Sequence, residues 1–74
     1  MSERAEQVAS ALTSEWQTTA QIAGRIPASP GVMPVSHLRA IYKHLDRMER
    51  WGEAERRVVR SPAGGREAMW RSRA

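Results

Sequence analysis

The amino-acid sequence predicts an α+β fold that is mainly helical, with three helices followed by a two-stranded β-hairpin. Apolar residues recur at the spacing of helix faces over residues 1–51, and the period changes to two over residues 53–72. A loop rich in proline, residues 27–35, and a turn with proline and glycine, residues 61–65, separate these segments. The 74 residues suffice for one small domain, residues 1–74, with a single apolar core.

The first two expected helices are short. Residues 3–14 carry an apolar stripe at helical spacing. Residues 18–26 fit a second helix, in which Thr18 and Gln21 form a capping box. Pro27 follows directly and is expected to stop this helix. Both helices therefore have one side that can face a common core.

The third expected helix, residues 36–51, has two contrasting faces. The apolar residues that define its core face are Leu38, Ile41, Tyr42, Leu45 and Met48. The cations on the opposite side are Arg39, Lys43, Arg47 and Arg50. Ser36 is the expected N-cap, and Gly52 is expected to adopt the left-handed conformation that ends a helix. Like charges four residues apart destabilise a helix by about 0.2–0.5 kcal/mol, which is either trivial or removed by a bound polyanion.

A β-hairpin is expected from residues 54–60 and 66–72, joined by the turn SPAGG. Alternation places four apolar residues over the helices: Ala54, Val58, Ala68 and Trp70. It leaves three arginines free to project: Arg57, Arg60 and Arg66.

Positive charge is concentrated in the second half of the chain. Residues 1–35 hold two arginines against three glutamates, a net charge of −1, whereas residues 36–74 hold ten cations against five acids, a net charge of +5. Such asymmetry is typical of nucleic-acid binders, because cations that neutralise phosphates release counterions. Eleven of the twelve cations are arginine, which suits bidentate contacts with phosphate or guanine. A GC-rich genome would explain the preference for arginine equally well, but not the asymmetry.

Composition and spacing argue against several other functions. The chain has no cysteine, which excludes a disulfide framework and fits a reducing cytoplasm. Its N-terminal residues are charged and lack a long apolar run, so neither a signal peptide nor a membrane span is expected. His37 and His44 lie about 10 Å apart on one helix flank, too far to share a metal ion without a third ligand. No catalytic constellation is evident, so we expect neither an enzyme nor a cofactor.

The three tryptophans allow two interpretations. They could form a stacking platform for single-stranded bases. Core packing is favoured for Trp16 and Trp70, whereas Trp51 falls about 115° from the centre of the apolar helix face and is expected to be partly exposed. Trp51 is therefore a candidate contact for a protein partner.

Several stretches resemble a winged helix-turn-helix domain over residues 5–72. WQTTAQIAGRI resembles the second helix of that family, and HLRAIYKHLDRMERWGEAERRV resembles its third helix running into the wing. The pattern L-x-x-L-x-x-x-G-x-[AV]-x-R is matched by Leu45, Met48, Gly52, Ala54 and Arg56. REAMWRS resembles the second wing strand, where an aromatic residue such as Trp70 seals the core.

The resemblance implies binding to double-stranded DNA, with the third helix in the major groove and the wing tip on backbone or minor groove. Carried over by position, it places five residues against base edges: Ser36, His37, Arg39, Ala40 and Lys43. It places three arginines on phosphate: Arg47, Arg60 and Arg66. We therefore expect a small transcriptional regulator or DNA-architecture factor of bacterial or phage origin, located in the cytoplasm on the nucleoid and without membrane contact.

Alternatives remain open on the sequence alone. A winged helix can also serve as a protein-interaction module that binds an acidic partner, such as a polymerase component, through the basic face or Trp51. A homodimer would strengthen sequence-specific binding, because one module buries a limited area, although the sequence shows no evident interface. A solvated surface is the simplest explanation of the cationic face.

Overall fold

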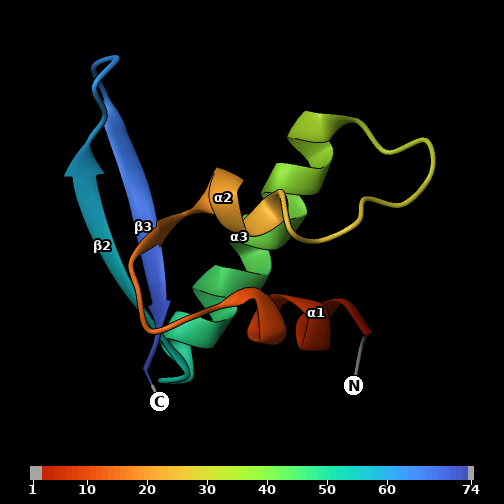
Figure 1. Cartoon of the computed structure of the whole chain (residues 1–74), viewed down its shortest axis with the longest axis horizontal. Helices are drawn as coiled ribbons and strands as arrows, with labels where there is room; N and C mark the ends of the chain where they lie inside the picture. The colour runs from red at the N-terminus through yellow and green to blue at the C-terminus, as the bar shows by residue number, and fades with distance from the viewer. Residues whose placement is uncertain (1–2, 74) are drawn as a thin grey trace.

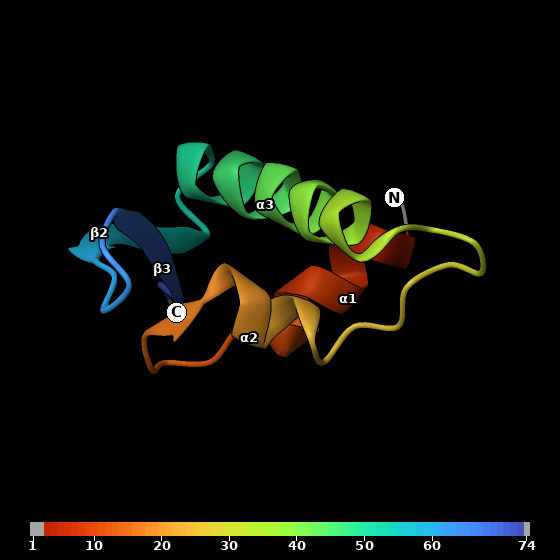
Figure 2. The same cartoon turned by 90° about the horizontal axis from the view of Figure 1, so that it is seen from above.

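The computed structural model describes residues 3–73, in which three helices and a small antiparallel sheet share one core (Figure 1). The elements in chain order are α1 (Glu3–Ala11), β1 (Gln17–Thr18), α2 (Thr19–Ala23), α3 (Pro34–Arg50), β2 (Ala54–Arg60) and β3 (Arg66–Ser72). Figure 2 shows α3 on one side and α1 with α2 on the other, while the β2–β3 hairpin lies at one end of the molecule.

The sheet has three strands in the order β1-β3-β2, so the expected fold of three helices followed by a two-stranded hairpin is wrong. β1 pairs antiparallel with β3, through Gln17 opposite Trp70 and Thr18 opposite Met69. This strand has only two residues, which is too short for sequence periodicity to indicate. It inserts a strand between the first two helices and attaches that segment to the end of the chain.

The two strands of the hairpin itself have the expected bounds. Their register runs from Ala54 opposite Ser72 to Arg60 opposite Arg66. The expected alternation is also correct, because Ala54 and Trp70 are both buried. Val58 shares their face but lies beyond the helices, and 55% of its surface is exposed.

α1 ends at Ala11 and not at residue 14 as expected, because the backbone of Thr13 bonds elsewhere. The carbonyl of Thr13 accepts a 2.7 Å hydrogen bond from the amide of Ser72, next to the end of the sheet. Its hydroxyl accepts one of 3.1 Å from the amide of Glu15. Threonine side chains compete with helical hydrogen bonding in this way.

α2 is shorter than the expected residues 18–26. Thr18 is its N-cap, and the capping box with Gln21 is confirmed, with both hydrogen bonds present. After Ala23 the chain tightens, because the amides of Arg25 and Ile26 bond to carbonyls three residues back. The final turn is therefore not α-helical.

α3 begins two residues before the expected position, so Ser36 is not its N-cap. Met33 occupies the N-cap position and makes no side-chain capping bond, and Pro34 is the first helical residue. Proline suits this position because its fixed φ is helical and its missing N–H is not needed there. The helix ends at Arg50, and Gly52 has the expected left-handed conformation, with φ +80°.

One buried cluster joins all three helices to the hairpin. Its members are Val8, Leu12, Ile22, Ala23, Ile26, Ile41, Leu45, Ala54 and Trp70. Trp70 has no exposed surface, donates its indole N–H to the Thr19 hydroxyl at 2.8 Å, and meets the Tyr42 ring edge-on at 5.4 Å between centroids. Leu38 and Tyr42, both expected in the core, are exposed over 36% and 39% of their surface because the groove between α3, α2 and the hairpin leaves them only partly covered.

Trp16 is not a core residue, contrary to expectation. It is half-buried against the face of the sheet opposite to Trp70. The guanidinium carbons of Arg57 and Arg71 each lie 4.6 Å from the centroid of its ring. Arg71 is also paired with Glu55 at 3.2 Å. Trp16 thus fastens the segment before β1 to the outer face of the sheet by cation–π contacts.

Candidate nucleic-acid interface

The exposed side of α3 carries three cations that no other side chain neutralises. Arg39, Lys43 and Arg47 are exposed, and their side chains make no ion pair or hydrogen bond with another residue of the described chain. Ser36 and Ala40, which the family resemblance places at the same surface, are exposed as well. Helical spacing sets all five on one side of α3. This side is a continuous basic surface.

The acids of α3 are paired, and they lie in its C-terminal half. Asp46 lies 3.3 Å from Arg50 and 3.7 Å from Arg56 of β2. Glu49 lies 3.7 Å from Arg56, which also donates a 3.4 Å hydrogen bond to the hydroxyl of Tyr42. Since α3 has no acid before Asp46, the charged residues in the first three turns of the helix are all cations.

The tip of the hairpin brings two further cations together. Arg60 and Arg66 are directly opposite in the register, both are exposed, and neither forms an ion pair within residues 3–73. Both lie on the same face of the sheet as Trp70, because they alternate in phase with it. Like charges directly opposite in a sheet are destabilising. An anion placed between these two guanidinium groups would remove that repulsion.

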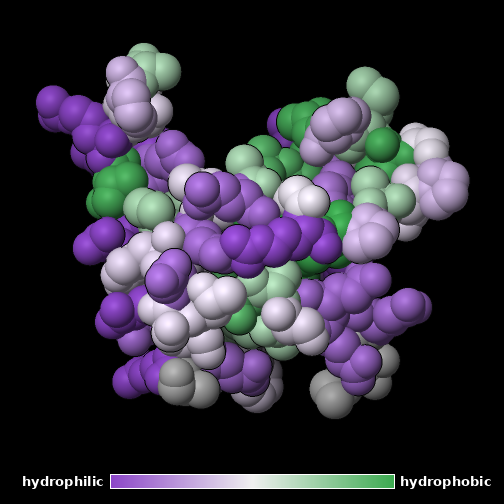
Figure 3. Space-filling view, viewed as in Figure 1, coloured by the Kyte–Doolittle hydropathy of each residue, from purple (hydrophilic) through white to green (hydrophobic). Residues whose placement is uncertain are grey.

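A groove of about 400 Å³ separates the hairpin from α3 and joins the two basic regions. Arg39 of α3 and Arg66 of β3 both line it. The other lining residues are Thr19, Ala20, Leu38, Tyr42, Glu67 and Ala68. Figure 3 shows the molecule hollowed between the hairpin tip at the upper left and the beginning of α3 at the upper right. The groove thus has a largely apolar floor with an arginine on each side.

His37, expected at the base-contacting surface, makes a structural contact. Its Nε2 atom lies 3.1 Å from the carbonyl oxygen of Ala23, at the end of α2, and the side chain is half-buried. This hydrogen bond holds α2 against α3. The sequence pattern gave no indication of it, because the two residues are fourteen positions apart.

Arg47 and Trp51 form a second exposed region, near the end of α3. Arg47 lies about 12 Å along the helix axis from Arg39. Trp51 is 76% exposed, as expected from its place on the helix. Burial, and then the charges of Arg47 and Arg4, lower the pKa of nearby His44 below its ordinary value of 6.5. A hollow of about 180 Å³ is lined here by Ala5, His44, Arg47, Met48, Trp51 and Glu53.

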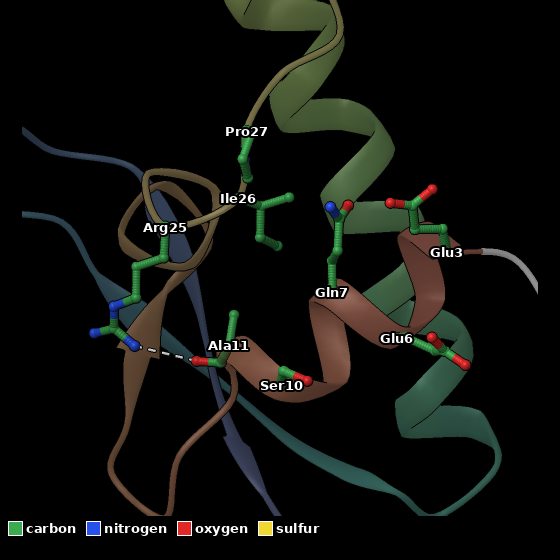
Figure 4. Close-up of a pocket in the computed structure, with 8 residues that line it drawn as sticks. All are labelled: Glu3, Glu6, Gln7, Ser10, Ala11, Arg25, Ile26 and Pro27. Atoms are coloured by element: carbon green, nitrogen blue, oxygen red, sulfur yellow. Dashed lines mark hydrogen bonds between the residues drawn. The ribbon is translucent and has the colours of Figure 1, made fainter.

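A further hollow lies away from this basic surface. It measures about 480 Å³ and lies between α1 and the chain that follows α2 (Figure 4). Glu3 and Glu6 line it from α1, and Arg25 donates a 3.1 Å hydrogen bond to the carbonyl of Ala11 at its edge. Ser10 is also on its wall, and the lining residues within 3–73 include no histidine.

Neither a metal centre nor a membrane-spanning helix is found in the described part of the chain. Residues 3–73 contain no cluster of three or more histidine or acidic residues that could hold a metal ion. Over the same residues, no helix combines the length and the apolar character needed to cross a bilayer. Comparisons with family models, curated proteins and solved structures found no match for this chain. The candidate interface therefore rests on its own geometry and charge.

Three exposed apolar residues of α3 are missed by sequence reasoning. The spacing of Leu38 and Tyr42 assigns them to the core, although both line the groove. Val35 is assigned to the loop, although it lies in the first turn of α3. Pro34 is the signal that locates Val35, because proline is favoured at the first position of a helix.

Proposed function

We propose that this chain binds double-stranded DNA through α3 and the β2–β3 hairpin. It would act as a small regulator or DNA-architecture factor of the winged-helix type, on the nucleoid of a bacterium or in a phage-infected cell. The observation that carries the proposal is the pairing pattern. Arg50 and Arg56 neutralise the acids of α3, whereas Arg39 and Arg66 line one groove with no ion-pair partner in the described chain.

The diameter of α3 suits the major groove of a duplex. An α-helix with its side chains is about 10–12 Å across, and the major groove of B-DNA is about 12 Å wide. With α3 in that groove, Arg39 and Lys43 face base edges, together with Ser36 and Ala40. Arginine can contact the O6 and N7 atoms of guanine in a bidentate manner, which is the commonest specific contact in such complexes.

We assign the remaining cations to the DNA backbone. Arg60 and Arg66 lie at the tip of the hairpin, and Arg47 lies further along α3. Contacts to phosphate fix the register of a protein on the duplex but carry no sequence information. We therefore propose that the first turns of α3 recognise the base sequence, whereas the hairpin tip and Arg47 bind phosphates.

Salt dependence tests this proposal directly. Each neutralised phosphate contributes about −0.9 to the slope of log affinity against log salt concentration. Four to six contacts, the number that these cations supply, give a slope of about −4 to −5 for random duplex DNA. Fluorescence anisotropy of a labelled duplex between about 50 and about 200 mM salt measures it. A flat response, or no binding at low salt, would contradict DNA binding.

A second candidate function is favoured by Trp51, the most exposed of the large hydrophobic residues. The hollow of about 180 Å³ beside it can accept an apolar side chain, while Arg47 at the hollow's edge can pair with a carboxylate. An acidic protein segment with one apolar anchor fits this chemistry. A polymerase component is one such partner.

A synthetic peptide separates the two candidates. A labelled peptide of glutamates around one leucine should bind the unchanged protein and not Trp51→Ala if this second surface is used. A matched peptide with glutamine in place of glutamate is the control. If DNA binding is the function, Trp51→Ala should leave duplex affinity nearly unchanged, and neither peptide should bind.

A further inference from the structure

Val35 holds an exposed position at the start of α3, in line with two of the cations. Pro34 is the first helical residue, so Val35 lies in the first turn, with 53% of its surface exposed. Val35, Arg39 and Lys43 follow at intervals of four residues and form a row along one side of the helix. The row therefore begins with an apolar side chain and continues with a guanidinium and an ammonium group.

Val35 is part of a larger exposed apolar surface. This surface consists of Val32 (41% exposed), Met33 (65%), Val35 (53%) and Leu38 (36%). Figure 3 shows hydrophobic atoms gathered at the upper right, where α3 begins in Figure 1. Isolated apolar residues are ordinary on protein surfaces, whereas four exposed ones within residues 32–38, of which Leu38 lines the groove, indicate a contact. The ligand should therefore offer an apolar group at this point.

Base edges in the major groove offer one such group, the C5-methyl of thymine. 5-Methylcytosine presents the same methyl group at the same position. A helix in the major groove contacts successive bases with residues three to four positions apart. Val35 therefore lies about one to two base pairs from the pair that Arg39 faces. We propose, building on the DNA-binding function above, that Val35 contacts a C5-methyl group about one to two base pairs from the base read by Arg39.

The charge around Val35 favours DNA over an apolar protein surface. The next two residues in its row are Arg39 and Lys43, and α3 has no acid before Asp46. A protein that covered Val35 would also have to neutralise both cations. The major groove supplies a methyl group, base-edge acceptors and phosphates within the same few base pairs.

Substitution of single thymines tests the contact. A preferred site is first selected from a random duplex library, and each thymine is then replaced by deoxyuridine, which removes only the methyl group. Loss of one buried methyl corresponds to about 0.8 kcal/mol, or about a fourfold loss of affinity. We expect this loss at one position, about one to two base pairs from the guanine whose recognition Arg39→Ala abolishes. A second pair of duplexes carries cytosine or 5-methylcytosine at that position.

Two valine variants provide matched controls. Val35→Ala should bind the thymine and deoxyuridine duplexes equally, because the methyl group no longer has a partner. Val58→Ala removes a valine that is similarly exposed, at 55%, but lies on the hairpin, and it should retain the fourfold difference. Circular dichroism confirms that both variants are folded.

The outcomes separate this contact from the proposed function. A loss in the deoxyuridine arm that Val35→Ala abolishes assigns thymine, and a gain confined to the methylcytosine arm assigns a methylated site. Duplex binding that no methyl substitution affects, or a methyl effect that persists in Val35→Ala, would overturn the contact alone. A selection that enriches no sequence would overturn it too, because a methyl contact implies a sequence preference. Absence of duplex binding would overturn the proposed function itself.

Discussion

The two ends of α3 use charged residues in opposite ways. At the C-terminal end, Asp46 and Glu49 are neutralised by Arg50 and Arg56, which ties the helix to β2. In the N-terminal half, Arg39 and its neighbours face no acid on their own helix, and apolar side chains are exposed beside them. The number of arginines alone therefore does not define a binding surface. The position of the acids decides which arginines stay available.

The hairpin repeats this contrast along its length. At its base, Arg56 lies 5.8 Å from the centroid of the buried Trp70 ring and holds two carboxylates. At its tip, Arg60 and Arg66 face each other with no acid paired to either in the described chain. The ends of α3 and of the hairpin that carry ion pairs, which we call the paired ends, lie against each other. The opposite ends, which we call the open ends and which carry Arg39 and Arg66, border one groove.

The largest effect on folding stability is expected for Trp70→Ala, at the paired end of the hairpin. Removing a buried tryptophan costs about 3–5 kcal/mol, which is comparable to the total stability of a domain of this size. The substitution also removes the hydrogen bond from Trp70 to Thr19 and the ring contact with Tyr42. Thermal or urea melts should show a severely destabilised or unfolded protein. Trp51→Ala, at a largely exposed site, should change stability by less than about 0.5 kcal/mol, and the reverse order would contradict our account of the core.

At the open end of α3, Arg39→Ala should reduce the preference for a selected DNA sequence and leave the folding stability unchanged. We expect a loss of about 1–3 kcal/mol of binding free energy on a selected site and little loss on random duplex. Arg66→Ala should weaken both complexes alike and reduce the salt slope by about one. The ratio of specific to non-specific affinity is the quantity to measure. If Arg66→Ala collapsed this ratio and Arg39→Ala left it unchanged, the hairpin would be the reader.

Arg56→Ala sharpens the comparison from the other side. It removes two ion pairs, a hydrogen bond to Tyr42 and a cation–π contact with Trp70, so we expect a loss of about 1 kcal/mol of folding stability. Chemical denaturation of Arg56→Ala and Arg39→Ala, in parallel, measures the difference. Equal stability of the two variants would show that the paired end is not held by these contacts.

The smallest effect is expected from pH, through His44. Because the pKa of His44 is lowered in the folded state, its proton binds more tightly to the unfolded chain. The stabilising contribution of neutral His44 is therefore complete above the unfolded pKa of 6.5 and decreases as pH falls towards the lower folded pKa. Thermal melts from about pH 8 to about pH 5 should show this decrease. His44→Gln should show a smaller decrease, and an identical profile would contradict the assignment.

Much of the fold could be predicted from the sequence because its signals are local. Alternation set the bounds of β2 and β3, and the Thr18–Gln21 pair located the start of α2. β1 could not be predicted, because two residues carry no period and its partner lies more than fifty positions away. The early end of α1 depends on a hydrogen bond from Ser72 to Thr13, which no local pattern records.

The candidate site was predicted only in part, for a similar reason. Helical spacing identified the exposed cations of α3, and the turn signal identified Arg60 and Arg66. Spacing cannot show whether a neighbouring element covers a residue, so Leu38 and Tyr42 were assigned to the core. Nor can it show that His37 bonds to the end of α2, or that Arg56 pairs with acids of another element.

The most direct test of the central claim compares two double variants of equal net charge. Arg47→Gln with Arg66→Gln removes two unpaired cations that we assign to phosphate, whereas Arg50→Gln with Arg71→Gln removes two that are paired with acids. Both reduce the formal charge from +4 to +2. The measurement is the slope of log affinity against log salt for one labelled duplex. The first variant should make the slope shallower by about two, and the second should leave it nearly unchanged. Equal changes in both variants would show that total charge, and not the set of cations without a paired acid, governs binding.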